Sequence, residues 1–520
     1  MRPILTADEM RAADAWTIVH GVSGPTLMEN AGLAVARAIE SRFGKERRVA
    51  IVCGPGNNGG DGFVIARVLK SEWTRVYVIG DPETLKGDAR HHYDRLRKER
   101  ARLQVSAIKT EAEWAEKAAE IGRSSLVVDA LLGSGAFGAP RGLTALAIEG
   151  IRREKARGAR VVSVDLPSGV PADGGAFDWK TVEADLTVTF AAKKPCLVFP
   201  PASELAGRVV VAPIGIPDEA LKFGDRGFRF FELEAKDARA AFPQRPMDSH
   251  KGDFGHVLIV AGSVGKAGAA LLAARGAFRA GAGLVTVASV AEVCRIVTSA
   301  QPEVMTVSLG EGGECGDIAR AATHILDVAG GMDALVIGPG LGRGPKTQEF
   351  ALDVVARCGA PVVMDADALY GLSAQTMSRV SQRDRPTILT PHPGEMARLL
   401  GLDTAAVQAD RVKALQRAVG ETRGTVILKG RHSLIGNSRF EVWLNPTGSA
   451  SLATAGTGDV LAGVIGALAA RGLEADSAAG ASVYVHGLAG ERAGKRRPWG
   501  VVAGDVAEAL PGAIASLRRS

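Results

Sequence analysis

Residues 48–62 read Arg-Val-Ala-Ile-Val-Cys-Gly-Pro-Gly-Asn-Asn-Gly-Gly-Asp-Gly, and this stretch decides the fold class. Its first six residues form a short β-branched run, typical of a buried strand. The glycine-rich part, 54–62, leads directly into an apolar segment, 63–69, in which we expect a helix. A strand that ends in a glycine-rich loop before a helix is the phosphate-binding arrangement of doubly wound α/β folds. A tight turn without a ligand is the alternative interpretation.

Charged side chains follow three other expected strands of the first half. Asp129 and Asp165 each end a strand-like run, and Lys194 comes shortly after the run 186–190. Ligands bind at the carboxyl ends of strands in open parallel sheets, so both carboxylates are candidate site residues. Either could instead cap a helix or a turn. Lys194 could neutralise a phosphate or lie in solvent, which is the commoner place for a lysine.

Before this region, two helices are expected over 6–20 and 25–43. The first begins with Thr6 and Glu9 at the spacing of a capping box. The second carries an apolar stripe at helical spacing, as a helix packed on a core does.

Length and composition indicate an ordinary globular chain of two or more domains. The chain has 520 residues, of which 46% are hydrophobic and 23% charged. Its net charge of +6 is weak evidence for nucleic acid and suits anionic small molecules equally well. Five cysteines without a C-x-x-C pair favour a reducing cytoplasm. We expect neither a signal peptide nor a membrane span, since no long apolar segment is present.

A second glycine-rich turn, Thr454-Ala-Gly-Thr-Gly-Asp-Val-Leu-Ala-Gly463, precedes an apolar helix. Backbone amides at the start of a helix form an anion site, so the amides of Gly456 and Gly458 could stabilise a phosphoryl group. Asp459 lies beside them, and a carboxylate would repel a phosphate. We interpret it as a general base for a hydroxyl that meets the phosphate. A helix-capping aspartate is the alternative.

Two more segments of the second half are candidate ligand contacts. His392 lies between prolines that fix the backbone, which favours ligand contact, although a structural histidine is the commoner case. Lys429–Ser433 follows a strand and could cradle a nucleotide, or form a hairpin turn between 425–428 and 434–435; both can be true. The segment 262–266 ends in Gly-Lys but lacks the spacing of a P-loop.

The motifs of the first half resemble those of the NAD(P)H-hydrate epimerase family. They are Gly-Pro-Gly-Asn-Asn-Gly-Gly-Asp-Gly, Val-Asp-Ala-Leu-Leu-Gly-Ser-Gly and Val-Asp-Leu-Pro-Ser-Gly, in this order. The resemblance implies a Rossmann-like three-layer sandwich that interconverts the C6 epimers of hydrated NADH or NADPH. It implies a potassium ion held by Asn58, Asp129 and Ser168, with Asp165 and Lys194 as catalytic residues. The residues implied to hold the dinucleotide are Asn57, Asn58, Gly59, Gly60, Asp61, Gly133, Ser134, Gly135, Ala136, Phe137, Gly138, Ala139 and Asp165.

The second half resembles the ribokinase-like superfamily and, within it, the ADP-dependent NAD(P)H-hydrate dehydratases. The resemblance rests on His-Lys-Gly at 250, Gly-Pro-Gly-Leu-Gly at 338, Thr-Pro-His-Pro-Gly-Glu at 390 and Ala-Gly-Thr-Gly-Asp at 455. It implies ADP with magnesium as co-substrate and Asp459 as the catalytic base. The positions implied to meet the hydrated dinucleotide are Gly268, Ala269, Gly340, His392 and Asp459. Those implied to meet the adenine nucleotide are Lys429, Gly430, Arg431, His432, Ser433 and Gly458.

We therefore expect an α/β chain with an epimerase domain over 1–220, a linker over 221–227 and a dehydratase domain over 228–520. The proline-containing, polar stretch 213–247 marks this boundary. The expected function is repair of hydrated nicotinamide cofactors by a cytoplasmic homo-oligomer that acts on small molecules, without nucleic-acid or membrane partners. Two alternatives are a ribokinase-like small-molecule kinase with an extra nucleotide-binding domain, and a nucleotide-binding module without turnover. Asp165 and Asp459 argue against the second, since pure binding needs neither carboxylate.

Overall fold

The computed structural model describes residues 1–44, 48–69, 73–100, 103–175, 177–222, 229–310, 318–497 and 499–518. The chain forms two compact units, Pro3–Arg226 and Gly227–Ser520 together with Met1–Arg2. Residues 223–227 of the expected linker, and Cys315, lie outside the described ranges. None of the described helices is long and apolar enough to cross a membrane.

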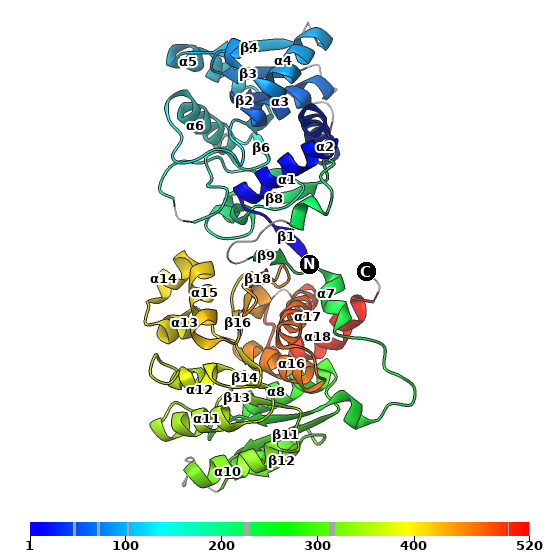
Figure 1. Cartoon of the computed structure of the whole chain (residues 1–520), viewed down its shortest axis with the longest axis vertical. Coiled ribbons are helices and arrows are strands. Elements are labelled where there is room, and N and C mark those ends of the chain that lie inside the picture. Colours follow the sequence, from blue (N-terminus) through cyan, green and yellow to red (C-terminus); the bar gives the residue numbers. More distant parts are fainter. Residues whose placement is uncertain are drawn as a thin grey trace. The chain divides into compact units, whose positions relative to one another are not determined.

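The first unit is built on a parallel sheet, which has seven strands among the described residues (Figure 1). In spatial order they are β4 (Gln104–Ile108), β3 (Thr74–Ile79), β2 (Val49–Cys53), β5 (Leu126–Ala130), β6 (Arg160–Val164), β7 (Leu186–Phe190) and β8 (Arg208–Ala212). The order reverses between β2 and β5, which is the doubly wound arrangement with its ligand crevice at the reversal. The predicted Rossmann-like fold is confirmed.

Helices cover both faces of this sheet and complete a three-layer sandwich. On one face, α2 (Gly24–Phe43), α3 (Asn57–Val68) and α4 (Gly87–Glu99) share a core with the β2 side chains Val49, Ile51 and Cys53. On the other face, α5 (Glu111–Ile121) and α6 (Gly142–Ala156) pack against Ala50 and Val52. Successive residues of a strand point to opposite faces, so β2 is apolar throughout and buried on both sides.

The helix after the first glycine-rich segment begins earlier than predicted. α3 starts at Asn57 rather than at residue 63, so that 57–61 is its first turn and not a loop. Glycine disfavours helix interiors, but this turn is buried: methyl groups on Gly60 and Gly62 would meet Met28 and Cys53 within 2.6 Å. Close packing therefore requires these glycines. The other two predicted helices are confirmed as α1 (Ala7–Val19), with its capping box, and α2.

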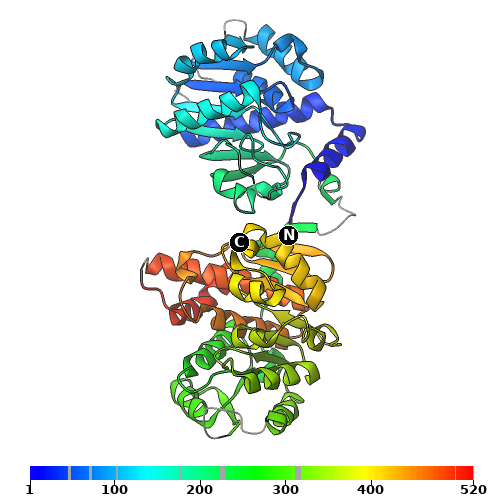
Figure 2. The same cartoon turned by 90° about the vertical axis from the view of Figure 1, so that its left-hand side faces the viewer.

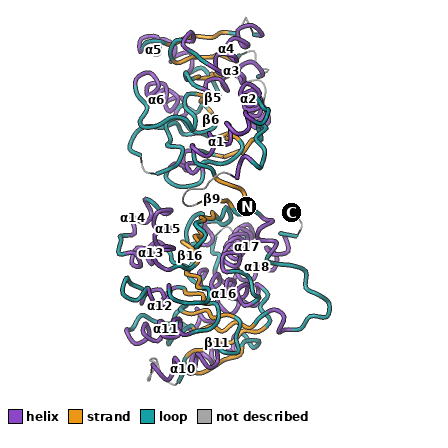
Figure 3. The backbone as a smooth tube through the Cα atoms, viewed as in Figure 1, coloured by secondary structure: helices purple, strands orange, loops and turns teal. Residues whose placement is uncertain are grey.

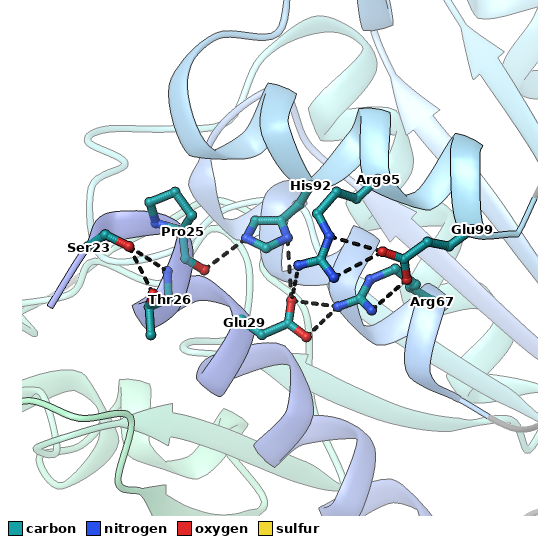
Figure 4. A network of polar contacts seen from close by, with 8 residues as sticks. All are labelled: Ser23, Pro25, Thr26, Glu29, Arg67, His92, Arg95 and Glu99. Atoms are coloured by element: carbon teal, nitrogen blue, oxygen red, sulfur yellow. Dashed lines mark hydrogen bonds and ion pairs between the residues drawn. The ribbon is translucent and has the colours of Figure 1, made fainter.

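A charged network joins the three helices on one face of the first unit (Figure 4). Glu29 of α2 accepts hydrogen bonds from Arg67 of α3 and from Arg95 of α4. Arg67 also pairs with Glu99 of α4 at 2.8 Å. His92 lies beneath the network, and its Nε2 is 3.0 Å from the carbonyl oxygen of residue 25. Burial lowers the pKa of His92.

The second unit has a larger mixed sheet, with eleven strands counted over the described ranges. In spatial order they are β12 (Met305–Ser308), β11 (Leu284–Ser289), β10 (His256–Val260), β13 (Ala334–Ile337), β14 (Val362–Met364), β15 (Thr387–Leu389), β16 (Thr425–Leu428), β17 (Leu434–Asn437), β18 (Glu441–Leu444), β9 (Arg229–Glu232) and β1 (Arg2–Ile4). The strands from β12 to β16 are parallel and reverse their order between β10 and β13. The predicted α/β class thus holds for this unit too.

Two helical layers enclose this sheet (Figures 1 to 3). One layer shares a core cluster with Val257 and Ile259 of β10 and consists of α7 (Ala235–Ala240), α8 (Ala267–Ala280), α9 (Ala291–Ala300), α16 (Thr457–Ala470), α17 (Ala475–Arg496) and α18 (Ala503–Ser516). The other contains α10 (Ile318–Ala329), α11 (Pro345–Arg357), α12 (Ser378–Ser381), α13 (Pro393–Leu400), α14 (Thr404–Ala409) and α15 (Arg411–Thr422). Glycines let α8 and α16 approach closely, because a methyl group on Gly463 would lie 1.9 Å from the Ala273 oxygen.

Two connecting segments predicted from the sequence contain regular structure. The stretch 213–247 is only partly irregular, since it contains β9 and α7, and both belong to the second unit. Because the stretch has prolines at both ends, these short elements could not be recognised in the sequence. The hairpin considered for the segment after residue 425 is confirmed, because β16, β17 and β18 pair antiparallel.

Candidate active sites

The candidate site of the first unit lies where the strand order reverses. The loops after β2 and β5 touch there: a methyl group on Gly54 would lie 2.0 Å from the Leu131 oxygen. The first turn of α3 and the turn 133–139 follow these two strands. Because parallel strands end at one edge of the sheet, the sequence motifs that follow them meet at this crevice.

An ion pair between Asp165 and Lys194 occupies the ends of β6 and β7. Lys194 Nζ donates to Asp165 Oδ1 at 2.6 Å and to Thr189 Oγ1 at 2.9 Å. Lys194 is only 1% exposed, so the alternative that it lies in solvent is wrong. Burial would raise the pKa of Asp165, but the charge of Lys194 and hydrogen bonds from Lys194 and Ser134 outweigh it and lower the pKa. Asp165 is therefore held ionised.

The turn 133–139 reaches the same carboxylate. The Ser134 N–H donates to Asp165 Oδ2 at 3.2 Å. Phe137, in the same turn, is largely exposed, and the Arg11 guanidinium of α1 lies 5.3 Å from its ring centre. Asp165 also has a φ of 63°, a conformation uncommon outside glycine that is often found at functional sites.

The predicted potassium ligands lie around the end of β5. The Ser168 hydroxyl donates to Asp129 Oδ1 at 2.5 Å, and its N–H donates to Oδ2 at 2.9 Å. Asn58 lies against this segment, since a methyl group on Gly133 would be 3.2 Å from Asn58 Oδ1. Through these hydrogen bonds Asp129 connects the chain after β6 to the end of β5. This is the structural role in a turn that the sequence offered as an alternative. The buried Asn58 Nδ2 has no hydrogen-bond partner in the described part of the chain.

Two further carboxylates lie near the ion pair. Burial and the negative charges of Asp165 and Asp14 raise the pKa of Asp61 well above its usual value. Burial, opposed by Lys194 and assisted by Asp165, raises the pKa of Asp14 to about 6. Asp14 was missed in the sequence because no motif contains it. Its only signal was a position one helical turn beyond buried Met10.

In the second unit, Asp459 lies in the first turn of α16. The helix begins at Thr457 and its N-cap is Gly456, so the alternative of a capping aspartate was wrong. The αL conformation of Gly456, with φ 88°, turns the chain into the helix. Burial and the charge of Asp365, opposed by Lys429, raise the pKa of Asp459 to about 7. A carboxyl with this pKa can exchange a proton near neutral pH.

A buried ion pair faces this helix start. Lys429 Nζ, at the end of β16, donates to Asp365 Oδ1 at 2.7 Å, and the Thr390 hydroxyl donates to the same oxygen at 2.6 Å. A methyl group on Gly458 would be 3.6 Å from Lys429 Nζ and 3.9 Å from Asp365 Oδ2. The motif at 454–463 and the segment at 429–433 are thus neighbours, as predicted. Asp365 lies in the sequence Asp-Ala-Asp at 365–367, and no role was predicted for it.

The turns expected to meet the dinucleotide also come together. A methyl group on Gly340 would lie 2.9 Å from the Ala269 side chain, and the Ser263 hydroxyl donates to the Gly340 oxygen at 2.8 Å. Asp367 lies beside them and pairs with Arg343 at 2.7 Å. Gly268 is next to Ala269 in the first turn of α8 and has open space at its Cα.

His392 has a visible structural role. It is the N-cap of α13, and its Nδ1 accepts hydrogen bonds from the Gly394 and Glu395 N–H groups at 3.0 and 3.2 Å. Its side chain is 54% exposed, and its Nε2 lies 3.4 Å from Glu395 Oε1. The Lys429 N–H donates to the Pro391 oxygen at 2.9 Å, so His392 lies beside the same strand end.

Arg411 of α15 holds the backbone of the segment Lys429–Ser433 in place. This buried guanidinium donates to the carbonyl oxygens of residues 428, 429 and 431 at 3.1, 3.3 and 2.5 Å. Gly430 and His432 both have positive φ, 141° and 52°. Ser433 Oγ donates to the Gly430 oxygen at 3.2 Å, and within the turn Gly430 and Arg431 are exposed.

Comparisons with known proteins agree with both halves. A family model for NAD(P)H-hydrate dehydratase matches residues 257–512, and a model for the N-terminus of YjeF-related proteins matches residues 24–196. The bifunctional NAD(P)H-hydrate repair enzyme Nnr of Moorella thermoacetica is 40% identical over 99% of this chain and 97% of its own length. The chain belongs to this family. The corresponding Escherichia coli protein is 34% identical over 93% of this chain and 87% of its own length.

The comparisons with solved structures each cover 55% of this chain. The ADP/ATP-dependent NAD(P)H-hydrate dehydratase of Bacillus subtilis, co-crystallised with ATP and Mg²⁺, is 29% identical with a TM-score of 0.47, over 55% of this chain and 98% of that one. A ribokinase-like superfamily protein of Enterococcus faecalis is 25% identical with a TM-score of 0.47, over 55% of this chain and 96% of that one. Family membership thus confirms the resemblance found in both halves of the sequence.

Proposed function

We propose that this chain repairs hydrated NADH and NADPH in two steps, one in each unit. The first unit interconverts the R and S epimers at C6, and the second dehydrates the S epimer with ADP, releasing AMP and phosphate. The observation that carries the proposal is a buried acid–base carboxylate at each crevice, in a chain whose bifunctional relatives match nearly all of it. A binding module without turnover needs neither group.

In the epimerase step, C6 carries a hydroxyl and is bonded to the ring nitrogen, so the hydrate is a hemiaminal. Removal of the hydroxyl proton lets the C6–N1 bond break, which gives an aldehyde and leaves the electron pair on N1. A proton must then reach N1, and closure on the other face of the aldehyde gives the other epimer. Asp165, held ionised by Lys194, is the base. The first turn of α3 and the turn 133–139 hold the dinucleotide.

The donor set in the first unit fits a potassium ion. Asp129 is fully buried and forms no ion pair with any described residue. Burial raises its pKa, although hydrogen bonds from Ser168 and Ser163 oppose this. A monovalent cation held by Asn58, Asp129 and Ser168 would supply the missing positive charge through oxygen ligands. When bound, it would organise the end of β5 for the substrate.

In the dehydratase step, Asp459 accepts the proton of the C6 hydroxyl while that oxygen attacks the terminal phosphorus of ADP. The bond to AMP breaks, and a phosphate ester forms at C6. Phosphate then leaves with the C6–O bond, and loss of a proton from C5 restores the dihydropyridine. Lys429 and the first amides of α16 face the phosphoryl group that moves. Magnesium supplies charge neutralisation on the nucleotide.

The binding roles proposed for the other residues of the second unit rest on the turns that come together near Asp459. The group formed by Gly268, Ala269, Gly340 and His392 meets the hydrated dinucleotide. The segment Lys429–Ser433, with Gly458, meets the adenine nucleotide. Lys429 of the second group pairs with Asp365, and Gly458, next to Asp459 in the chain, lies beside this pair.

One assay tests both steps. Each purified epimer of hydrated NADH is incubated with the chain, ADP and magnesium, and the absorbance of the restored dihydropyridine is followed. Asp459→Asn should abolish recovery of both epimers. Asp165→Asn should confine recovery to the S epimer, apart from the enzyme-free rate of epimerisation. The matched control is Asp384→Asn, at an exposed position of the second unit.

Absence of recovery by the unaltered chain would contradict the dehydratase proposal, and recovery of the S epimer alone would contradict the epimerase proposal. A ribokinase-like kinase would instead accumulate a phosphorylated product without restoring the dihydropyridine.

We further infer a cytoplasmic homo-oligomer. The four described cysteines, Cys53, Cys196, Cys294 and Cys358, are free and buried, which suits a reducing compartment. Light scattering coupled to size-exclusion chromatography measures the oligomeric state directly, and a monomeric mass would refute that part of the inference.

A further inference from the structure

Helix α1 packs on the two segments that carry the epimerase ion pair. Ala7, at its start, shares a core cluster with Leu166 and Cys196. Leu166 directly follows Asp165, and Cys196 comes two residues after Lys194. One turn later, Met10 packs in a second cluster with Ala192, just before the lysine. Two successive turns of α1 therefore pack on the residue after Asp165 and on the chain on either side of Lys194.

Asp14 lies on the same side of α1. Met10, Asp14 and Thr17 are spaced by four and three residues, so they form one stripe, and Met10 and Thr17 are buried. Arg11 follows Met10 in α1. Its guanidinium lies over the ring of Phe137, which belongs to the turn 133–139. Asp14 is thus one helical turn beyond the residues of α1 that contact the lysine segment and the turn implied to hold the dinucleotide.

The Asp14 carboxylate is partly buried yet has no structural partner. Within the described ranges it makes no hydrogen bond and no ion pair, unlike Asp165. It is not a capping residue either, since Thr6 and Glu9 cap this helix. A carboxylate removed from water without a partner costs stability, so its retention on a face that points at a crevice indicates a functional role.

Three charged groups on other elements interact electrostatically with Asp14: Lys194 after β7, Asp165 after β6 and Asp61 in α3. Burial is the main reason that the pKa of Asp14 rises to about 6, while that of Asp165 is lowered. Two carboxyls in one site whose environments push their proton affinities apart are typical of an acid–base pair.

We propose that Asp14 is a further catalytic residue of the epimerase, the acid that donates a proton to the ring nitrogen while Asp165 removes the hydroxyl proton. The C6–N1 bond breaks, its electron pair goes to N1, and the Asp14 proton forms the N–H bond. On closure, Asp14 takes this proton back and Asp165 returns its proton to the oxygen. No other reactant is needed. The inference rests on the epimerase activity proposed above.

The test uses the full chain with pure R and pure S hydrate, ADP and magnesium. Asp14→Asn should lower kcat for recovery of the R epimer by about 100-fold or more, after subtraction of the enzyme-free rate. Recovery of the S epimer should not change, because the dehydratase site is intact. The matched control in the same unit is Glu116→Gln in α5, whose side chain is 74% exposed. Asp14→Glu should restore part of the activity.

The pH profile separates catalysis from a structural role. Asp14 must be protonated to act, so kcat of the unaltered epimerase should fall as the pH rises through about 6, and Asp14→Asn should lose this dependence. This profile is measured as conversion of the R into the S hydrate without ADP, so that the pH dependence of the dehydratase does not enter. The inference is overturned if Asp14→Asn keeps kcat within about threefold, or changes KM alone with the same pH profile. Loss of this dependence in Asp61→Asn and not in Asp14→Asn would also overturn it, in favour of Asp61. If the unaltered chain fails on the R epimer, the epimerase proposal itself fails.

Discussion

Replacing Lys194 by methionine should destabilise the first unit by an amount that grows with pH. The ammonium group of Lys194 is 2.6 Å from Asp165 Oδ1, and both side chains are buried, with 2% and 9% exposed. Methionine fills a similar volume without the charge. The variant therefore leaves the carboxylate of Asp165 buried and unpaired, a change that usually costs about 3–5 kcal/mol.

The pH dependence follows from the proton on Asp165. In the unaltered chain the pKa of Asp165 is lowered, so the pair stabilises the fold above the ordinary pKa of 3.8 and loses this effect as pH falls through the lowered value. In the variant, burial is opposed only by the hydrogen bonds from Ser134 and Thr189, so Asp165 can become protonated instead. Protonating Asp165 costs about 1.36 kcal/mol for each pH unit above its ordinary pKa of 3.8. This cost limits the loss of stability in the variant to about 5 kcal/mol at about pH 7.5 and to about 1.6 kcal/mol at about pH 5.

Hydrogen exchange measured by mass spectrometry on the full chain resolves this loss by domain. Peptides from β5 and β6 report the first unit, and peptides from β13 and β14 serve as internal controls in the second. The variant and the unaltered chain are compared at each pH, because intrinsic exchange rates also depend on pH. The matched control is Lys180→Met, which removes an exposed pair with Glu149 and should cost less than about 1 kcal/mol.

A loss below about 1 kcal/mol at about pH 7.5, or an equal loss at both pH values, would refute the reasoning. Either result would mean that the pair is not held out of water. Recovery of the S hydrate should be unchanged in this variant, since the second unit is untouched.

Three further predictions concern the second unit. Dehydratase kcat should fall about tenfold per pH unit below about 7, because Asp459 must be ionised to accept a proton; a pH–rate profile checks this. Arg411→Met should raise KM for ADP about tenfold in steady-state assays, because three carbonyl groups of the 428–431 segment lose their donor, while exposed Arg417→Met should not. Gly463→Ala should cost about 1–3 kcal/mol or more in thermal unfolding, since its methyl group would meet a backbone oxygen of α8 at 1.9 Å, whereas Gly420→Ala, with open space, should be neutral or stabilising.

Much of each site could be predicted because its residues lie directly after strands. The first turn of α3, Asp129, Asp165 and the segment at 429 each follow a short apolar run that could be recognised locally. In a parallel sheet the ends of such runs meet at one edge, so recognising the strands also placed these residues together. The glycine-rich turn before α16 joined them because its helix must pack on the same sheet.

Other parts depended on contacts between distant segments. The burial of Lys194 had no local signal, because lysine usually lies in solvent and its partner is 29 residues away; only the family resemblance implied its role. Asp365 gained its neighbours Thr390 and Lys429 only through the pairing order of three strands. Asp14 belongs to no motif, and its position over the crevice depends on where α1 docks.

The sequence by itself therefore determined the α/β class, the family and the set of strand-end motifs, because strand, turn and helix signals are local. Tertiary structure alone decided which carboxyls hold a proton. The pKa of Asp165 is lowered by an ammonium group on another strand, whereas those of Asp14 and Asp459 are raised chiefly by burial. Charge and desolvation act through space, so the same residue type at the end of a strand or in a helix becomes a base or an acid only once the chain is folded.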